Sequence, residues 1–170
     1  MILIDTKNPM KNSLVHNMCT QRRPYNYSER IYIAQNEWMQ NYVQHSLIPP
    51  IESTRARGGR ELLKELQLSW KKFQRVQSLF CKYFKYLDRS YVKHRELKSI
   101  QESAIQIFRS SLGENSLDEA AAEVFIGDIV QFIDNTRGEE DGNSMDAYVI
   151  ENIKIFDKLG RSVCYRVVSK

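Results

Sequence analysis

Few residues of this chain have the types and spacing that catalysis or metal binding requires. The three histidines, His16, His45 and His94, lie on separate segments and form no HExxH pair. His16 and Cys19 could share a metal or form a nucleophile pair, but a helix surface with a small buried thiol is the commoner arrangement. No GxxxxGK[ST], GxGxxG or GxSxG motif occurs. We therefore expect no enzyme activity, no cofactor and no metal site.

Two further groups of residues resemble sites only superficially. The acidic run Glu139-Glu140-Asp141-Gly142 lacks the alternating ligands of a calcium loop, so a solvated turn is expected.

The three cysteines are widely separated and include no CxxC pair; they are Cys19, Cys81 and Cys164. Reduced thiols favour the cytoplasm or nucleus. No apolar stretch reaches the ~20 residues that cross a bilayer, so no membrane partner is expected.

Positive charge is the one broad electrostatic signal. The formal net charge is +4, and many of the cations lie between Arg60 and Lys93. This excess permits an acidic partner, and a solvated basic helix face is the default interpretation. A basic nucleic-acid-binding helical domain is the alternative. The aromatic residues of the same stretch keep core spacing and no RNA-binding signature occurs, so nucleic acid is the less favoured partner.

The elements that must position these residues are helices, because apolar residues recur at steps of three and four. We expect helices over about residues 10–20, 27–47, 60–94, 99–112, 116–133 and 145–159. Between them the sequence predicts a flexible N-terminus over 1–9, a loop over 138–144 and an extended tail over 161–170. Helices without a sheet predict an all-α bundle, because isolated helices gain stability by burying apolar faces against each other.

Several helix details can be tested. In the second helix Ile31, Ala34, Trp38 and Tyr42 form one apolar stripe, and Pro49 and Pro50 are expected to end the helix. The long third stretch could bend between Ser69 and Phe73. Ser99 with Glu102, and Ser116 with Glu119, have the spacing of capping boxes.

The segment Leu79–Val92 carries more apolar surface than one helix face needs. One stripe consists of Phe80, Phe84, Leu87 and Tyr91, and a second of Leu79, Tyr83 and Tyr86. A central helix of the bundle would explain the pattern. Lys82, Lys85 and Arg89 lie among the rings, however, and buried unpaired charge is costly. The pattern therefore predicts rings shared between the core and another protein.

Several segments, in order, resemble the amino-terminal region of cullins, especially the plant Cullin-1 type. They are Asn17-Met18-Cys19-Thr20-Gln21, Trp70, Tyr86-Leu87-Asp88-Arg89-Ser90-Tyr91-Val92, Ile107-Phe108-Arg109, Ile133-Asp134, Arg137-Gly138-Glu139 and Ile155-Phe156. The resemblance implies stacked five-helix cullin repeats of the α-solenoid kind. Residues 10–112 would form the first repeat, and residues 113–160 the start of the second.

The resemblance also implies a function. A cullin amino terminus is a non-catalytic scaffold that docks a Skp1-like adaptor, and through it an F-box receptor, in a cullin-RING ubiquitin ligase of the SCF type. The docking surface uses the second and fifth helices of the first repeat. Carried over by match, the partner-binding residues are Tyr83, Tyr86, Arg89, Tyr91, Val15 and Met18.

This sequence departs from the cullin pattern in two ways. Asn12 and His16 stand where the family's second helix has aromatic anchors, which predicts weaker adaptor binding. The part of a cullin that binds the RING protein has no counterpart here, so no RING partner is expected on this fragment. A truncated competitor for adaptors without ligase activity, and a degenerate gene product, are the alternatives to a working scaffold.

Overall fold

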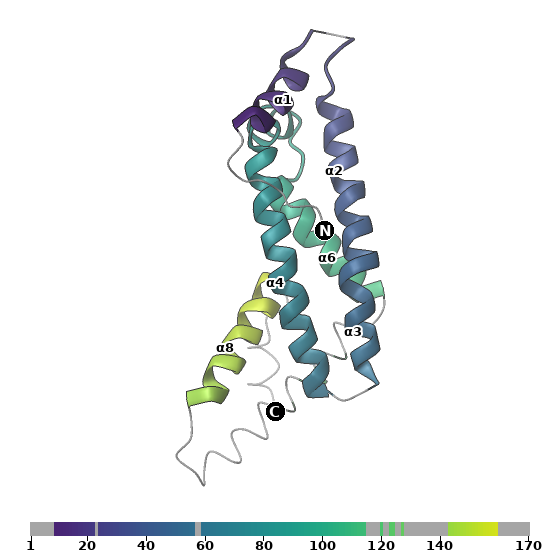
Figure 1. Ribbon diagram of the computed structural model, residues 1–170, viewed down its shortest axis with the longest axis vertical. Coiled ribbons are helices and arrows are strands. Elements are labelled where there is room, and N and C mark those ends of the chain that lie inside the picture. Colours follow the sequence, from purple (N-terminus) through teal and green to yellow (C-terminus); the bar gives the residue numbers. More distant parts are fainter. Residues whose placement is uncertain are drawn as a thin grey trace.

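The computed structural model describes residues 9–22, 24–56, 59–114 and 143–159, together with 120, 123, 124 and 127. Every regular element among these residues is a helix, which confirms the expected all-α fold. The helices form an elongated stack in which α4 runs along most of the length (Figure 1). Of the helix expected over 116–133 the structure describes residues 120, 123, 124 and 127 alone, and all four are helical; the capping box at Ser116 and the two chain ends lie outside the described residues.

Helix α2 (Ser28–Tyr42) and helix α3 (Ile48–Arg55) form one continuous helical path through a π-helical turn, η1 (Val43–Leu47). The prediction that Pro49 and Pro50 end the helix was therefore wrong. The two prolines lie in the first turn of α3, where no backbone N–H has to be donated within the helix. The wider turn before them is closed by the Ile48 N–H, which donates to the Val43 carbonyl five residues back.

Helix α4 (Gly59–Tyr83) is the longest element, and the other helices are arranged around it. Helices α3, α6 (Ile100–Glu114) and α8 (Asn143–Lys158) pack against α4, and α2 packs against α6. No bend occurs near Ser69, because Ser69, Trp70 and Phe73 lie inside α4 and are all buried. The interruption instead comes at Phe84, after the last residue of α4.

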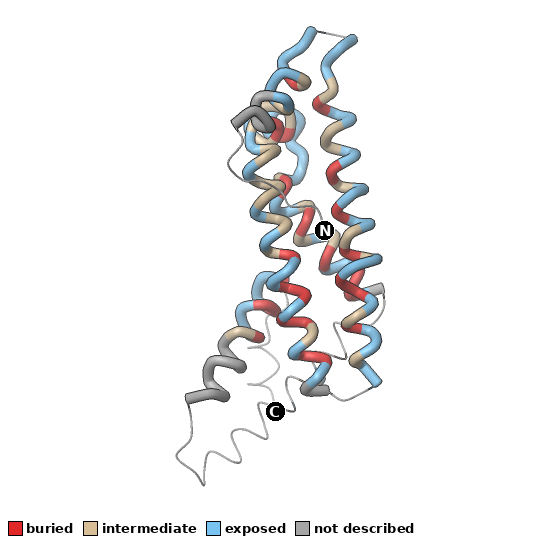
Figure 2. Tube along the Cα trace, viewed as in Figure 1, coloured by how far each residue is buried: buried red, intermediate tan, exposed pale blue. Residues whose placement is uncertain are grey.

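The main core lies where α3, α4, α6 and α8 meet, in the lower part of Figure 2. Its centre is aromatic: the Phe108 ring centroid lies 5.3 Å from that of Trp70 and 4.8 Å from that of Phe73. Around these rings pack aliphatic side chains that are almost fully buried, namely Met39, Val43, Leu47, Ile51, Leu62, Leu63, Leu66, Leu112 and Ile155. The helices are thus held together chiefly by apolar burial.

The buried side of α2 differs from the predicted stripe. Gln35 and Met39 are buried, whereas Ala34 is exposed and Trp38 is 47% exposed. Trp38 is covered on its faces by Tyr42 and Phe80, whose ring centroids lie 5.4 and 4.9 Å away. Mutual stacking of these aromatic rings substitutes for burial of Trp38 in the core.

Two leucines of α4 test how much of the stability comes from this core. Leu66 is buried and Leu68, two residues along the same helix, is 51% exposed. We expect Leu66→Ala to lower the free energy of unfolding by about 2–5 kcal/mol, because it removes a side chain and leaves a cavity. Leu68→Ala is the matched control and should change it by less than about 0.5 kcal/mol. Urea unfolding followed by circular dichroism measures both, and equal losses would contradict this description of the core.

Candidate functional site

The segment predicted to carry surplus rings, Leu79–Val92, begins in the last residues of α4. Phe84 leaves the α-helical region, with φ −97° and ψ 16°, and a short helix α5 (Lys85–Leu87) and a π-helical turn η2 (Asp88–Val92) follow. Backbone hydrogen bonds continue across this point, from the Phe84 N–H to the Phe80 carbonyl and from the Asp88 N–H to the Phe84 carbonyl, both 2.9 Å. The path stays helical, but the side chains of α5 and η2 are rotated relative to those of α4.

A second apolar cluster lies beneath this segment and is much smaller than the main core. Among the described residues, only Cys19, Leu87 and Ile100 are buried within it. The hydrophobic side chains packed around them stay partly exposed, and they are Val15, Ile31, Tyr32, Phe80, Cys81, Phe84, Tyr86 and Tyr91. The described helices therefore cover the rings of this segment incompletely. Burial raises the pKa of the Cys81 thiol, and the nearby Asp88 carboxylate adds to that increase.

Helix α1 (Pro9–Thr20) supplies the other side of the site, because it lies against α5 at this end of the molecule (Figure 1). The His16 ring meets the Tyr86 ring edge-on, with 4.4 Å between centroids. Val15 packs on the small cluster, and the Met18 carbonyl accepts a hydrogen bond from the Tyr27 N–H at 3.1 Å. The packing thus brings His16 of α1 beside Tyr86 of α5, which lies 70 positions later in the sequence.

Asn26 fixes the angle between α1 and α2. Its side-chain N–H donates to the Cys19 carbonyl at 2.8 Å, and its side-chain oxygen accepts from the Ser28 N–H at 3.1 Å. One amide side chain therefore satisfies a free carbonyl at the end of α1 and a free N–H at the start of α2. This arrangement holds α1 across the end of the bundle.

Asp88 ties η2 to the beginning of α6. Its Oδ1 accepts a hydrogen bond from the Ile100 N–H at 3.0 Å, across a loop of the chain. Next to it the predicted capping box is confirmed: the Ser99 N–H and Oγ donate to the Glu102 carboxylate, and the Glu102 N–H donates back to Ser99 Oγ. These hydrogen bonds lower the pKa of Glu102, so the box persists above the ordinary carboxyl pKa and weakens as acidification protonates Glu102.

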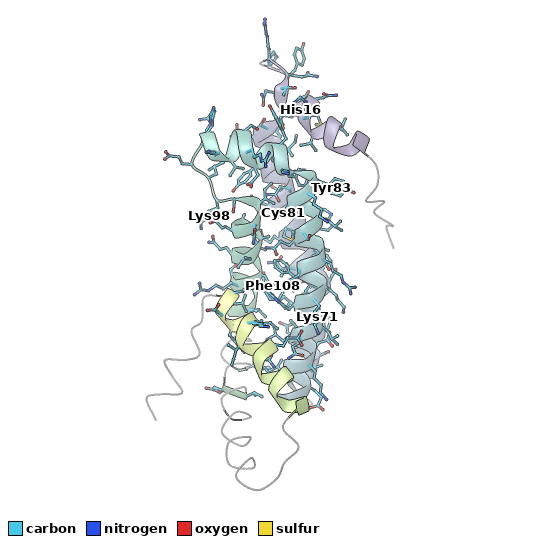
Figure 3. The ribbon with its side chains drawn as sticks, turned by 90° about the vertical axis from the view of Figure 1, so that its left-hand side faces the viewer. His16, Lys71, Cys81, Tyr83, Lys98 and Phe108 are labelled. Atoms are coloured by element: carbon cyan, nitrogen blue, oxygen red, sulfur yellow. The ribbon has the colours of Figure 1, made fainter. Side chains whose placement is uncertain are left out.

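The predicted docking residues differ in how accessible they are. Val15, Met18, Tyr83 and Tyr86 are partly exposed and Arg89 is exposed, as are its neighbours Lys82 and Lys85. Figure 3 shows Tyr83 near the α1 end of α4. Tyr91 turns toward α2, where its ring centroid lies 6.2 Å from that of Tyr32. Their assignment to a partner stays a prediction.

An open cleft of about 320 Å³ separates α1, α2 and η2. Its lining residues are Cys19, Asn26, Ser28, Glu29, Tyr86, Ser90, Tyr91, His94 and Arg95. Through this cleft one edge of Tyr86 and of Tyr91 can be reached. Asp88 was not predicted as a site residue, and His16 was predicted as the loss of an aromatic anchor rather than as a contact of Tyr86. The helix break at Phe84 that positions Asp88 and Tyr86 has no periodic signal in the sequence.

The described part of the chain holds no cluster of three or more His, Cys, Asp and Glu residues with metal-binding geometry. His16 and Cys19, which were considered as a metal or nucleophile pair, face different surroundings. The His16 ring contacts Tyr86, while Cys19 is buried in the small cluster. Among the described helices, none is both long enough and apolar enough to cross a membrane. The surface at the α1 end of the molecule thus consists mainly of aromatic rings and positively charged side chains.

Comparison with known proteins gives the relationship of this chain. Residues 12–167 match the family model described as the Cullin alpha solenoid domain. Cullin-1 of Oryza sativa subsp. japonica is 26% identical over 152 residues, which cover 89% of this chain and 19% of that protein. Cullin-2 of Arabidopsis thaliana is 26% identical over 139 residues, covering 82% of this chain and 17% of that protein.

A shorter relative is matched over a larger share of its length. Cullin-like protein 3 of Arabidopsis thaliana is 23% identical over 144 residues, or 85% of this chain and 51% of that protein. The chain therefore spans about a fifth of the two cullins and about half of the cullin-like protein that it matches.

The Asp88 contact yields a stability prediction. We expect Asp88→Ala to lower the free energy of unfolding by about 1 kcal/mol, because the Ile100 N–H at the start of α6 loses its acceptor. Asp157→Ala, which makes the same change at an exposed position of α8, is the control and should change it by less than about 0.5 kcal/mol. Chemical denaturation measures both. A loss at Asp88 no larger than at Asp157 would show that the hydrogen bond does not hold η2 to α6.

Proposed function

This chain belongs to the cullin family, and on that basis we propose that it is a non-catalytic docking module for a Skp1-like adaptor of an SCF-type ubiquitin ligase. The adaptor binds the docking face, which we define as Val15, Met18, Tyr83, Tyr86 and Arg89. An F-box receptor joins indirectly, through the adaptor. The proposal extends to the cytoplasm or nucleus as the place where the module works.

The observation that carries the proposal is the incomplete cover over the rings at the end of α4. In the described part of the chain the small cluster buries only three side chains, whereas eight hydrophobic side chains around it are partly exposed. Leaving such surface in water forgoes roughly 25 cal/mol for each Å² that a partner could bury. An aromatic surface beside cations has the composition typical of a protein interface.

The two sides of the docking face, α1 and the helical path from the end of α4 to η2, have different parts in binding. Tyrosines suit an interface because the ring buries area at little conformational cost while the hydroxyl keeps a hydrogen bond. Arg89 is exposed beside them and can pair with a carboxylate of the adaptor. Helix α1 contributes Val15 and Met18 as the apolar border.

The position of His16 bears on the weaker adaptor binding that the missing aromatic anchor predicts. The sequence predicts a loss of affinity because a histidine stands at an aromatic position of the family pattern. In the structure the His16 ring still packs edge-on against Tyr86 at 4.4 Å. This contact restricts the rotamers of Tyr86, so we propose that His16 orders the docking face and offsets part of that loss.

Tyr83 is the residue at which the proposal is tested. We expect Tyr83→Ala to weaken binding of a purified Skp1-like adaptor carrying an F-box subunit by about tenfold or more, since central aromatic anchors dominate interfaces. Isothermal titration calorimetry gives the dissociation constants, and circular dichroism verifies that each variant is folded.

Tyr25→Ala is the matched control, because Tyr25 is 62% exposed and lies in the connection between α1 and α2. It should leave the dissociation constant within about twofold of that of the unaltered chain. If the unaltered chain shows no binding at tens of micromolar, or if Tyr25→Ala weakens binding as much as Tyr83→Ala, the proposed docking face is wrong.

A further inference from the structure

The second half of α4 and the short helix α5 after it carry positive charge with no acidic residue in the same stretch. From Lys71 to Leu87 the sequence holds five cations, Lys71, Lys72, Arg75, Lys82 and Lys85, and no aspartate or glutamate. All five of these cations are exposed. Lys71 and Arg75 are four residues apart, and like charges at that spacing destabilise a helix slightly. This stretch therefore gains from any partner that brings negative charge.

The stretch is hollowed into an open groove of about 550 Å³. We call it the basic groove, and its lining residues are Lys71, Gln74, Arg75, Ser78, Leu79 and Lys82. These residues are spaced by three and four, so they lie in a row along the helix. Figure 3 shows Lys71 on α4 beside α8, with Tyr83 farther along α4 toward α1. The basic groove and the docking face share no residue.

Helix α8 determines the charge at the lower end of the basic groove. Glu151 pairs with Lys71, with 2.8 Å between the carboxylate oxygen and Nζ, and the two side chains are 41% and 53% exposed. Lys158 Nζ lies 3.2 Å from the Gln74 side-chain oxygen when the amide is oriented to accept its neighbours' hydrogen bonds. Among the described residues, Glu151 thus neutralises Lys71, while Lys158 adds a positive charge beside Gln74.

The groove also has an uncharged part that selects among acidic partners. Leu79 is partly buried and Ser78 exposed, and both lie between Arg75 and Lys82. An incoming segment can place carboxylates on the cations and a leucine-sized side chain on Leu79. None of the lining residues that the structure describes has an aromatic ring, whereas sequence-tolerant binding of single-stranded nucleic acid uses rings as stacking platforms. Both features favour a peptide over a nucleic acid.

We propose that the basic groove is a second docking site, which binds an acidic amphipathic segment of a partner protein. The segment presents Glu or Asp side chains to Arg75 and Lys82 and an apolar side chain to Leu79. Charge complementarity fixes its chemistry, and the helical spacing of the groove residues suits a segment that is itself helical. The site does not depend on adaptor binding at the docking face.

The test uses a fluorescein-labelled peptide of repeated Glu-Leu-Glu-Ala units, titrated with the full chain and followed by fluorescence anisotropy. We expect saturable binding that weakens several-fold between about 50 and 200 mM salt, because exposed charges are screened over this range. The double variant Arg75→Glu/Lys82→Glu should weaken binding by about tenfold or more. Thermal unfolding verifies that the variant folds.

The matched control is Lys64→Glu/Lys93→Glu, which makes the same change of charge at two exposed cations outside the groove. It should weaken binding by no more than about threefold, the effect of overall charge alone. Tyr83→Ala should leave peptide binding unchanged, which separates this result from a failure of the adaptor proposal. The variant Leu79→Ser should also weaken binding, because it removes the apolar contact, and thermal unfolding verifies that this variant is folded.

Three results would overturn the second site. One is the absence of peptide binding at 50 mM salt with the chain at about 1 mM, a concentration that would detect even weak complexes. Another is an equal loss in the groove variant and its control, which would reveal unspecific attraction. The third is a single-stranded oligonucleotide of equal charge that binds more tightly than the peptide and displaces it, which would assign the groove to nucleic acid.

Discussion

The contact of Trp70 and Phe73 with Phe108 fixes the position of α4, and the rest of the molecule is built around that helix. The three rings lie within 4.8 to 5.3 Å of one another by centroid, and each is almost fully buried. Because this contact and the surrounding aliphatic side chains occupy one side of α4, its opposite flank stays open to solvent. Both proposed binding surfaces lie on the part of the helix, or of its continuation, that this core leaves uncovered.

Much of the fold could be predicted from the sequence, because apolar periodicity reports which residues face a core. Helices α1, α6 and α8 begin and end close to the predicted residues, and the Ser99–Glu102 box is where its spacing indicated. Helix α4 begins where it was predicted to begin but ends at Tyr83, and the rest of the predicted stretch forms α5 and η2. The prolines after α2 misled because a proline ends a helix only where its missing N–H is needed. After the π turn, Pro49 and Pro50 lie in the first turn of α3, where no backbone N–H is needed as a donor.

The site was only partly predictable. The surplus of rings between Leu79 and Val92 is visible as two stripes, and the structure leaves most of them half covered. Their directions are set by the break at Phe84, a change of backbone angles that periodicity does not report. The same limit explains Trp38: its spacing fits a buried stripe, but stacking on Tyr42 and Phe80 lets it lie at the surface.

The placement of two different surfaces along one continuous element has a consequence for binding. The docking face is aromatic and the basic groove is charged, and the path from Lys71 to Arg89 is helical except at Phe84. A partner, or a pair of linked partners, that occupies one surface is held near the other at high effective concentration. Two contacts that are each weak then give tight binding together. Because one contact is aromatic and the other electrostatic, the affinity of each can change without changing the other. A module with few fully buried rings at its docking end gains most from such a second contact, because its first interface need not supply the whole affinity.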